Sequence, residues 1–233
     1  MPGTAAQERA AGMRLIVTAG ATREWIDPVR FISNPSSGQM GWQIARAGQG
    51  TFAEVVFIAG ATDPRFHELD GAHCVTAEST LEMQQAVLTQ LGDHCLLIMA
   101  AAPADYRPAK AENQKIKKEK QEELQIRLVR NPDILLSVAE RRNDYRDLIV
   151  VGFAAETDQL LAHARSKLQR KQLDFICANQ VFKTEQGFSQ DHNSLLLISA
   201  RDTDVQTLGP ASKALLAQEL LTTILEKIVH IPA

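Results

Sequence analysis

Short runs of aliphatic residues alternate along this chain with longer segments in which apolar residues recur every three or four positions. The short runs predict buried strands at residues 14–18, 54–60, 95–101, 148–153, 174–178 and 195–199. The longer segments predict helices at residues 41–49, 80–91, 132–142, 158–171 and 211–228. This alternation of strands and helices predicts an α/β fold, with a mostly parallel sheet and helices on both of its faces.

Two polar segments interrupt the alternation. Residues 103–123 carry five lysines between Lys110 and Lys120 and lack helical periodicity, and residues 179–193 are also polar and irregular. Irregular segments of this length in a compact domain are usually functional or disordered.

Composition narrows the class of protein. With 233 residues, 45% of them apolar, the chain can bury the core of one α/β domain, which we place at residues 13–233. Residues 1–12 lack the apolar region of a secretory signal, and we expect them to be a disordered leader. No apolar run approaches the roughly 20 residues that a membrane span needs. The net charge of −3 gives no general case for nucleic acid or membrane binding. A cytoplasmic protein is expected.

Small residues follow four of the predicted strands. They are found at residues 18–24, 100–106, 152–157 and 178–180, where ligands of open parallel sheets bind. Small residues let a ligand approach the backbone, although tight turns require them too. Neither a GxGxxG nor a GxxxxGK[ST] motif is present, which argues against a dinucleotide site and a P-loop.

Three polar stretches have both a structural and a functional interpretation. Ser36, Ser37 and Gly38 precede a predicted helix, so they are either an N-cap or an anion site. Lys115 and its neighbours Lys117 and Lys118 would neutralise a polyphosphate or simply be solvated. Asn131-Pro132-Asp133 is typical of a helix start, with Asn131 as the cap.

Two further patterns bear on chemistry. Lys167 and Lys171 share a face of one predicted helix, and Lys171 lies near its apolar stripe, so it requires a frayed helix end or an anionic partner. The three cysteines and six histidines have no metal-ligand spacing, and no nucleophile–base–acid triad is evident.

Together, these motifs resemble phosphopantothenate–cysteine ligase, which in many bacteria is the C-terminal half of a bifunctional flavoprotein. The matching stretches run in the family's order from residue 14 to about 193: VTAGATREWIDPVRFISNPSSGQMG, AAAPADYRP, KIKK, RNPDIL, VGFAAET, ARSKLQRKQLDFICAN and QGFSQDHN. The resemblance implies a Rossmann-like fold and a role in coenzyme A biosynthesis.

The implied reaction has two steps. The carboxylate of 4′-phosphopantothenate attacks the α-phosphate of CTP, with Mg²⁺, to give an acyl-cytidylate and pyrophosphate, and L-cysteine then displaces CMP. The KIKK stretch is similar to that of the bacterial enzymes that use CTP. No FMN is expected, because the flavin-dependent decarboxylase half is absent from this sequence, and a separate or fused decarboxylase would supply that step.

The resemblance also implies residue roles. Asn34 would bind the acyl group, and Lys115 would lie over the reacting carboxylate and phosphate. The implied CTP set is Ala101, Asp105, Lys115, Pro132, Asp133, Ile134, Leu135, Phe153, Lys167 and Lys171, and a weaker phosphate loop comprises Gly20, Ser36, Ser37 and Gly38. The resemblance names no metal ligands. It implies a homodimer in which residues 178–188 reach the partner.

Three positions depart from the family pattern. Gln39 stands where lysine is common, Pro35 where a basic or polar residue is common, and Pro103 where valine is usual. The first two leave open an alternative function, a nucleotide-binding regulatory or interaction domain that has lost turnover.

Overall fold

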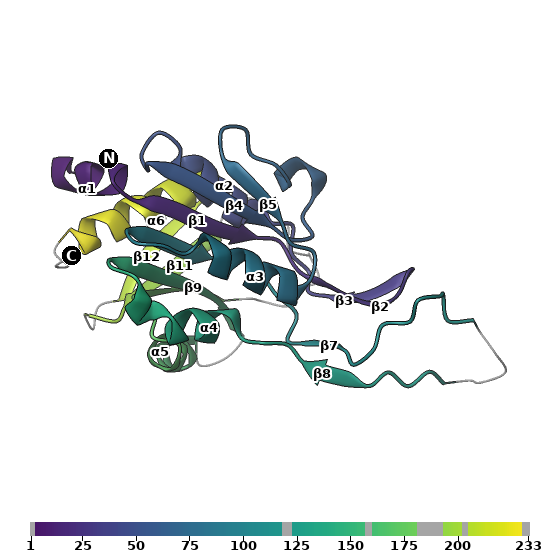
Figure 1. Cartoon of the computed structure of the whole chain (residues 1–233). Coiled ribbons are helices and arrows are strands. Elements are labelled where there is room, and N and C mark those ends of the chain that lie inside the picture. Colours follow the sequence, from purple (N-terminus) through teal and green to yellow (C-terminus); the bar gives the residue numbers. More distant parts are fainter. Residues whose placement is uncertain (1–2, 118–122, 157–159, 181–192, 202–204, 230–233) are drawn as a thin grey trace.

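The computed structural model describes residues 3–117, 123–156, 160–180, 193–201 and 205–229. Its centre is an eight-stranded sheet in the order β12-β11-β10-β9-β6-β1-β4-β5 (Figure 1). The strands are β1 (Arg14–Ala19), β4 (Glu54–Ala59), β5 (His73–Thr76), β6 (Cys95–Met99), β9 (Leu148–Glu156), β10 (Phe175–Gln180), β11 (Asn193–Ser199) and β12 (Val205–Ala211). All neighbours pair in parallel except β10–β11 and β11–β12. The predicted mostly parallel sheet is confirmed.

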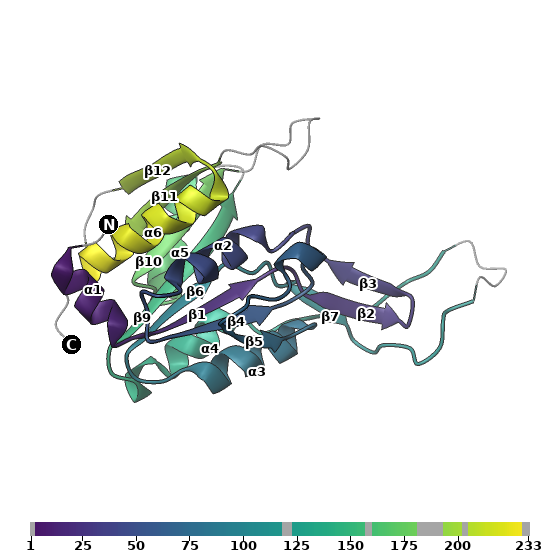
Figure 2. The same cartoon turned by 90° about the horizontal axis from the view of Figure 1, so that it is seen from above.

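Helices cover both faces of this sheet, as predicted (Figures 1 and 2). Helices α1 (Thr4–Ala11), α2 (Gln39–Gly48) and α6 (Lys213–Ile228) pack on one face, and α3 (Thr80–Gln90), α4 (Ile134–Glu140) and α5 (Leu160–Arg170) on the other. Side chains along β1 alternate between the two layers, with Leu15 and Val17 in the first and Ile16 in the second. Each is fully buried, which stabilises the fold by about 1.5–3 kcal/mol per side chain. None of the described helices is long and apolar enough to cross a bilayer.

Within the segment expected to be a disordered leader, residues 4–11 form α1. Ala6 and Ala10 are buried in the core layer that includes α6. Arg9 donates to the carbonyl of Ile228 near the end of α6 and to the carboxylate of Asp147. The expectation of disorder is therefore wrong for this segment, because a short alanine face was enough to dock it.

Two excursions project from the carboxyl ends of the strands (Figures 1 and 2). One is a hairpin of β2 (Arg23–Asp27) and β3 (Arg30–Ser33), in which the rings of Trp25 and Phe31 pack edge to face at 5.0 Å. The other begins with β7 (Tyr106–Pro108), returns through β8 (Leu128–Arg130), and contains most of the predicted irregular segment 103–123.

The second irregular segment, 179–193, falls largely outside the described residues. Its first two residues belong to β10 and its last residue begins β11. The predicted partner-contacting segment, residues 178–188, likewise lies mainly outside the described part of the chain. Two short 3₁₀ turns, η1 (Pro64–Phe66) and η2 (Arg142–Asp144), complete the described elements.

Candidate active site

Asn34 and the predicted phosphate loop lie where the strand order of the sheet reverses. From β1 the chain adds β4 and β5 on one side, then returns to place β6 and β9 on the other. Ala21, just past β1, bridges both neighbours, pairing with Ala61 after β4 and with Ala102 after β6. Reversal points of this kind are where open α/β sheets bind ligands.

Asn34 is held over the loop that follows β6. Its side-chain amide nitrogen donates to the carbonyls of Ala102 at 3.3 Å and Pro103 at 3.0 Å. Because both partners are acceptors, they fix the orientation of the amide, and its oxygen is left for a ligand. Beneath it, the N–H of Ala101 donates to the Thr18 hydroxyl at 3.2 Å. The side chain of Asn34 itself is exposed.

A buried polar network supports this loop, and it was not predicted from the sequence. The N–H of Ala104 donates to the Thr22 hydroxyl at 2.9 Å, which contacts the Thr80 hydroxyl at 2.8 Å. Glu24 is only 3% exposed and accepts from both the N–H and the hydroxyl of Thr80. The only signal in the sequence was a run of polar residues directly after a buried strand. Asn131 joins the network by donating to the Ala104 carbonyl at 2.8 Å.

The phosphate loop, Gly20 with residues 36–38, is built on two left-handed glycines. Gly20 has a φ of 82° and Gly38 a φ of 78°. Both approach the methyl group of Thr62, which would lie 2.6 Å from a Cβ at Gly20 and 2.5 Å from one at Gly38. The loop is fixed further because the N–H of Asp63 donates to the Ser37 carbonyl at 3.0 Å.

Neither serine of this loop is the helix cap that the sequence suggested. Gly38 is the N-cap of α2, and it makes no side-chain capping bond. The hydroxyls of Ser36 and Ser37 accept from the N–H groups of Gly38 and Gln39 only at 3.4 Å. First-turn N–H groups that are weakly satisfied at a helix start can bind an anion.

A lysine from another element reaches the same helix start. The ammonium of Lys213, the first residue of α6, donates to the side-chain oxygen of Gln39 at 3.0 Å. The family pattern has lysine at position 39, where this chain has glutamine. The ammonium of Lys213 places a positive charge beside that position instead.

The Pro132–Leu135 turn meets the end of α5. Asp133 is the N-cap of α4 and accepts from the N–H of Leu136 at 3.3 Å. The expectation that Asn131 is the cap is wrong, because its side chain is engaged with the loop after β6. Lys171 lies one residue beyond α5, and its ammonium is 2.9 Å from the Asp133 carboxylate. Of the two alternatives predicted for Lys171, a helix end or an anionic partner, the structure thus has both.

The other predicted nucleotide residues lie on several elements. Ile134 and Leu135 are 4% and 9% exposed, so their side chains belong to the core and only their backbone can face a ligand. Asp105 is exposed, and its carbonyl accepts from the Asn131 N–H at 2.8 Å. Phe153 is half-buried within β9 and packs against the opposite core layer from Ile134 and Leu135. The carbonyl of Lys167 accepts from the N–H of Lys171 at 3.0 Å.

Lys115 is not brought to the other site residues. Its neighbour Ile116 donates to Asp27 at 3.2 Å and accepts from Arg30 at 3.2 Å, at the turn of the β2–β3 hairpin. Burial raises the pKa of Asp27, but the N–H groups of residues 29, 116 and 30 outweigh it, so the net shift is downward. Among the described residues, no hydrogen bond or ion pair joins Lys115 to Asn34, and Lys115 is exposed.

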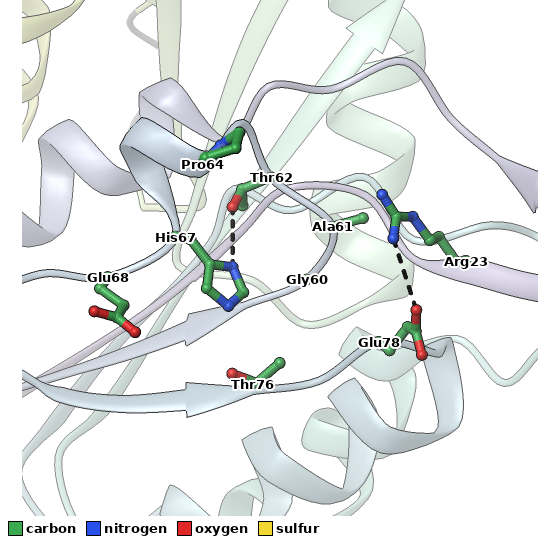
Figure 3. Close-up of a pocket in the computed structure, with 9 residues that line it drawn as sticks. All are labelled: Arg23, Gly60, Ala61, Thr62, Pro64, His67, Glu68, Thr76 and Glu78. Carbon is green, nitrogen blue, oxygen red and sulfur yellow. Dashed lines mark hydrogen bonds and ion pairs between the residues drawn. The ribbon is translucent and has the colours of Figure 1, made fainter.

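A cavity of about 630 Å³ opens beside the phosphate loop, over the ends of β4 and β5 (Figure 3). Arg23 and Glu78 form one side, and their charged groups lie 3.8 Å apart. His67 and Glu68 form the other side, and the Thr62 hydroxyl contacts Nδ1 of His67 at 3.2 Å. No cluster of three or more His, Cys, Asp or Glu side chains in the described part of the chain could hold a metal ion.

Comparisons with known proteins agree on one family. A sequence model of the DNA/pantothenate metabolism flavoprotein C-terminal domain matches residues 10–228. The chain is 42% identical over 221 residues to the coenzyme A biosynthesis bifunctional protein CoaBC of Escherichia coli K12, covering 92% of this chain and 52% of that protein. It is 39% identical over 217 residues to CoaBC of Vibrio vulnificus CMCP6, covering 93% of this chain and 53% of that protein.

The chain thus spans about half the length of the curated relatives it matches. The crystal structure of the C-terminal domain of a CoaBC protein aligns with a TM-score of 0.72 and 31% identity, covering 94% of this chain and 97% of that one. The chain therefore belongs to the family of DNA/pantothenate metabolism flavoprotein C-terminal domains.

Proposed function

We propose that this chain catalyses the CTP-dependent ligation of 4′-phosphopantothenate and L-cysteine in coenzyme A biosynthesis. A carboxylate oxygen of phosphopantothenate forms a bond to the α-phosphorus of CTP, and the bond from that phosphorus to the β-phosphate bridge breaks, releasing pyrophosphate. The cysteine nitrogen then bonds to the acyl carbon, the acyl–phosphate bond breaks, CMP leaves, and the amine loses a proton.

One observation carries the proposal. The Asn34 amide is anchored over the β6 loop at the reversal point, on the segment that leads directly into the phosphate loop and α2. A substrate carboxylate bound at the β6 loop and a triphosphate bound at the phosphate loop would meet beside Asn34. Adenylylation and cytidylylation of this kind need positioning and charge screening rather than a covalent side-chain nucleophile, which is consistent with a site that offers no triad.

The Asn34 amide would serve the acyl group. Its N–H groups are held by two carbonyls in this structure, so donation to a developing oxyanion requires it to exchange one of them. Lys115 would join the reacting groups only when the excursion that carries it changes position or when a second copy supplies it. The proposed CTP set comprises Ala101, Asp105, the 132–135 turn, Phe153, Lys167 and Lys171.

Mg²⁺ would enter with the nucleotide. This ion is commonly bound by one or two carboxylates together with substrate phosphates and water, so a preformed protein cage is not needed. Asp105 is the exposed carboxylate that the β6 loop presents at the site. The bound ion would screen the triphosphate against the attacking carboxylate.

The test is pyrophosphate release that requires CTP, phosphopantothenate and Mg²⁺ together. We expect Asn34→Ala and Asn34→Asp to accumulate the acyl-cytidylate, detected by quenching and chromatography. Full product formation by Asn34→Ala would refute the role of Asn34. Each nucleoside triphosphate should be supplied in turn, because the preference for CTP rests on the KIKK resemblance alone.

A second candidate is a regulatory or interaction domain that binds nucleotide without turnover, and Pro35 and Gln39 favour it. Calorimetry that detects CTP binding, under conditions in which an intact relative turns over and this chain does not, would support it. For the ligase we also propose a homodimer, a cytoplasmic location, and a decarboxylase that is either fused or separate.

A further inference from the structure

The cavity beside the phosphate loop has a charge pattern that none of the assigned roles uses. It is bordered by the guanidinium of Arg23 and by the carboxylates of Glu68 and Glu78, with the imidazole of His67 between them (Figure 3). A guanidinium faces a ligand carboxylate well, and a carboxylate pairs with an ammonium. The cavity therefore matches a ligand that carries both charges.

The Arg23–Glu78 pair is loose enough to admit such a ligand. Its charged groups are 3.8 Å apart, and the side chains are 40% and 46% exposed. Arg23 also lies 4.8 Å from the centre of the Phe31 ring, which supports the planar guanidinium from one side. A ligand carboxylate could therefore bind the edge of the Arg23 guanidinium without a rearrangement of the hairpin.

The two acidic groups argue against the other substrates. Phosphopantothenate and CTP are multiply anionic, and a wall with two carboxylates and one arginine repels a phosphate unless metal intervenes. Of the three proposed substrates, only the amino acid is a zwitterion at neutral pH.

The cavity adjoins the position of the acyl group. Arg23 pairs with Ser33 across the β2–β3 hairpin, and Asn34 follows Ser33 directly. Ala21 separates the two places, since it pairs with Ala61 in the wall of the cavity and with Ala102 beneath Asn34. Among the residues that line the cavity, Arg23 is the one that the hairpin pairing links to Asn34, so its side of the cavity is the side we assign to the acyl group.

We propose that this cavity binds the α-amino acid acceptor as its zwitterion, with Arg23 on the carboxylate and Glu78 on the ammonium, before the acceptor moves onto the acyl group. The inference rests on the proposed function, because it assigns a place to the one substrate that the other site residues leave unassigned. His67 completes the wall, since its Nδ1 is held by the Thr62 hydroxyl while the ring faces the cavity (Figure 3).

The variants Arg23→Gln and Glu78→Gln test this assignment through steady-state kinetics with L-cysteine varied. We expect the KM for cysteine to rise roughly 10- to 100-fold, as for the loss of one charged hydrogen bond, while the KM values for CTP and phosphopantothenate stay within about twofold. Arg23→Lys should recover part of the loss. Arg65→Gln is the matched control, because Arg65 carries the same charge nearby but pairs with Asp63 and does not border the cavity.

Cysteamine, which lacks the carboxylate, separates the two contacts. The parent should prefer cysteine over cysteamine, and Arg23→Gln should lose most of that preference, whereas Glu78→Gln should keep it. Equal increases in all three KM values, or an unchanged preference in Arg23→Gln, would overturn the inference. Pyrophosphate release by the parent in the absence of cysteine tests the ligase proposal separately. If no pyrophosphate is released, the ligase proposal fails, and the assignment of the amino acid site is not what has been refuted.

Discussion

Replacing Gly38 with alanine should strain the phosphate loop in two ways. The backbone has a φ of 78°, and a left-handed conformation costs an L-residue about 1–2 kcal/mol. The new Cβ would also lie 2.5 Å from the Thr62 methyl and 3.0 Å from the Thr62 Cβ, an overlap of the kind that costs about 1–3 kcal/mol. We therefore expect Gly38→Ala to lower the free energy of unfolding by about 2–5 kcal/mol.

A second substitution separates these costs. Thr62→Ser removes the methyl group but keeps the hydroxyl that contacts His67 at 3.2 Å. In the double variant the overlap with the methyl group is gone and the backbone strain remains. We expect the double variant to be more stable than Gly38→Ala by part of the overlap cost, and to stay about 1–2 kcal/mol below Thr62→Ser.

The assay is urea unfolding of all four proteins followed by circular dichroism, with calorimetric titration of CTP on each folded variant. We expect Gly38→Ala to lose CTP affinity because the N–H groups of the loop move. A Gly38→Ala protein within about 0.5 kcal/mol of the parent, with unchanged CTP affinity, would refute the reasoning. Strict additivity of the two substitutions would show that the loop relaxes away from Thr62.

Three other perturbations have defined outcomes. Lys213→Gln should weaken CTP binding most strongly at low salt, and adding Gln39→Lys should restore it; no change in CTP affinity would exclude a phosphate contact by Lys213. Asp174→Ala removes a carboxylate 2.6 Å from a part-buried arginine, so urea unfolding should show a loss of about 3–5 kcal/mol, and a loss below 1 kcal/mol would contradict it. Burial raises the pKa of the Cys177 thiol above its ordinary 9.0, so the stability that it contributes is present below that pH and is lost above it. The free energy of unfolding should fall more steeply above pH 9 in the parent than in Cys177→Ala, and equal slopes would count against this.

The central strands could be predicted because their residues are apolar on both faces, as in the run from Cys95 to Met99. The marginal elements could not. Strand β12 is interrupted by Gly209 and Pro210 and has few buried residues, so no period marks it in the sequence. The β2–β3 hairpin has one aromatic pair, Trp25 and Phe31, and its other contacts are polar ones made by Glu24 and Asp27 to distant residues, which no local pattern marks.

The candidate site also has a part that local sequence patterns predict and a part that depends on distant contacts. The motif that contains Asn34 could be recognised from the sequence, but the partners of Asn34 are backbone carbonyls about 70 residues away, which no local pattern specifies. The same holds for Glu24 and Thr80, which meet only once the sheet has formed. Asn131 had every local feature of a helix cap, and a tertiary contact to Ala104 engaged its side chain instead.

The position of Ala21 has a consequence for engineering. Its backbone lies between the cavity wall after β4 and the loop after β6, since it forms isolated bridges to Ala61 on one side and Ala102 on the other. A larger side chain at Ala21 would disturb both compartments together. Libraries aimed at a different amino acid acceptor should therefore vary Glu68 in the cavity wall and keep Arg23 and Glu78, which we propose hold the carboxylate and ammonium that all such acceptors share.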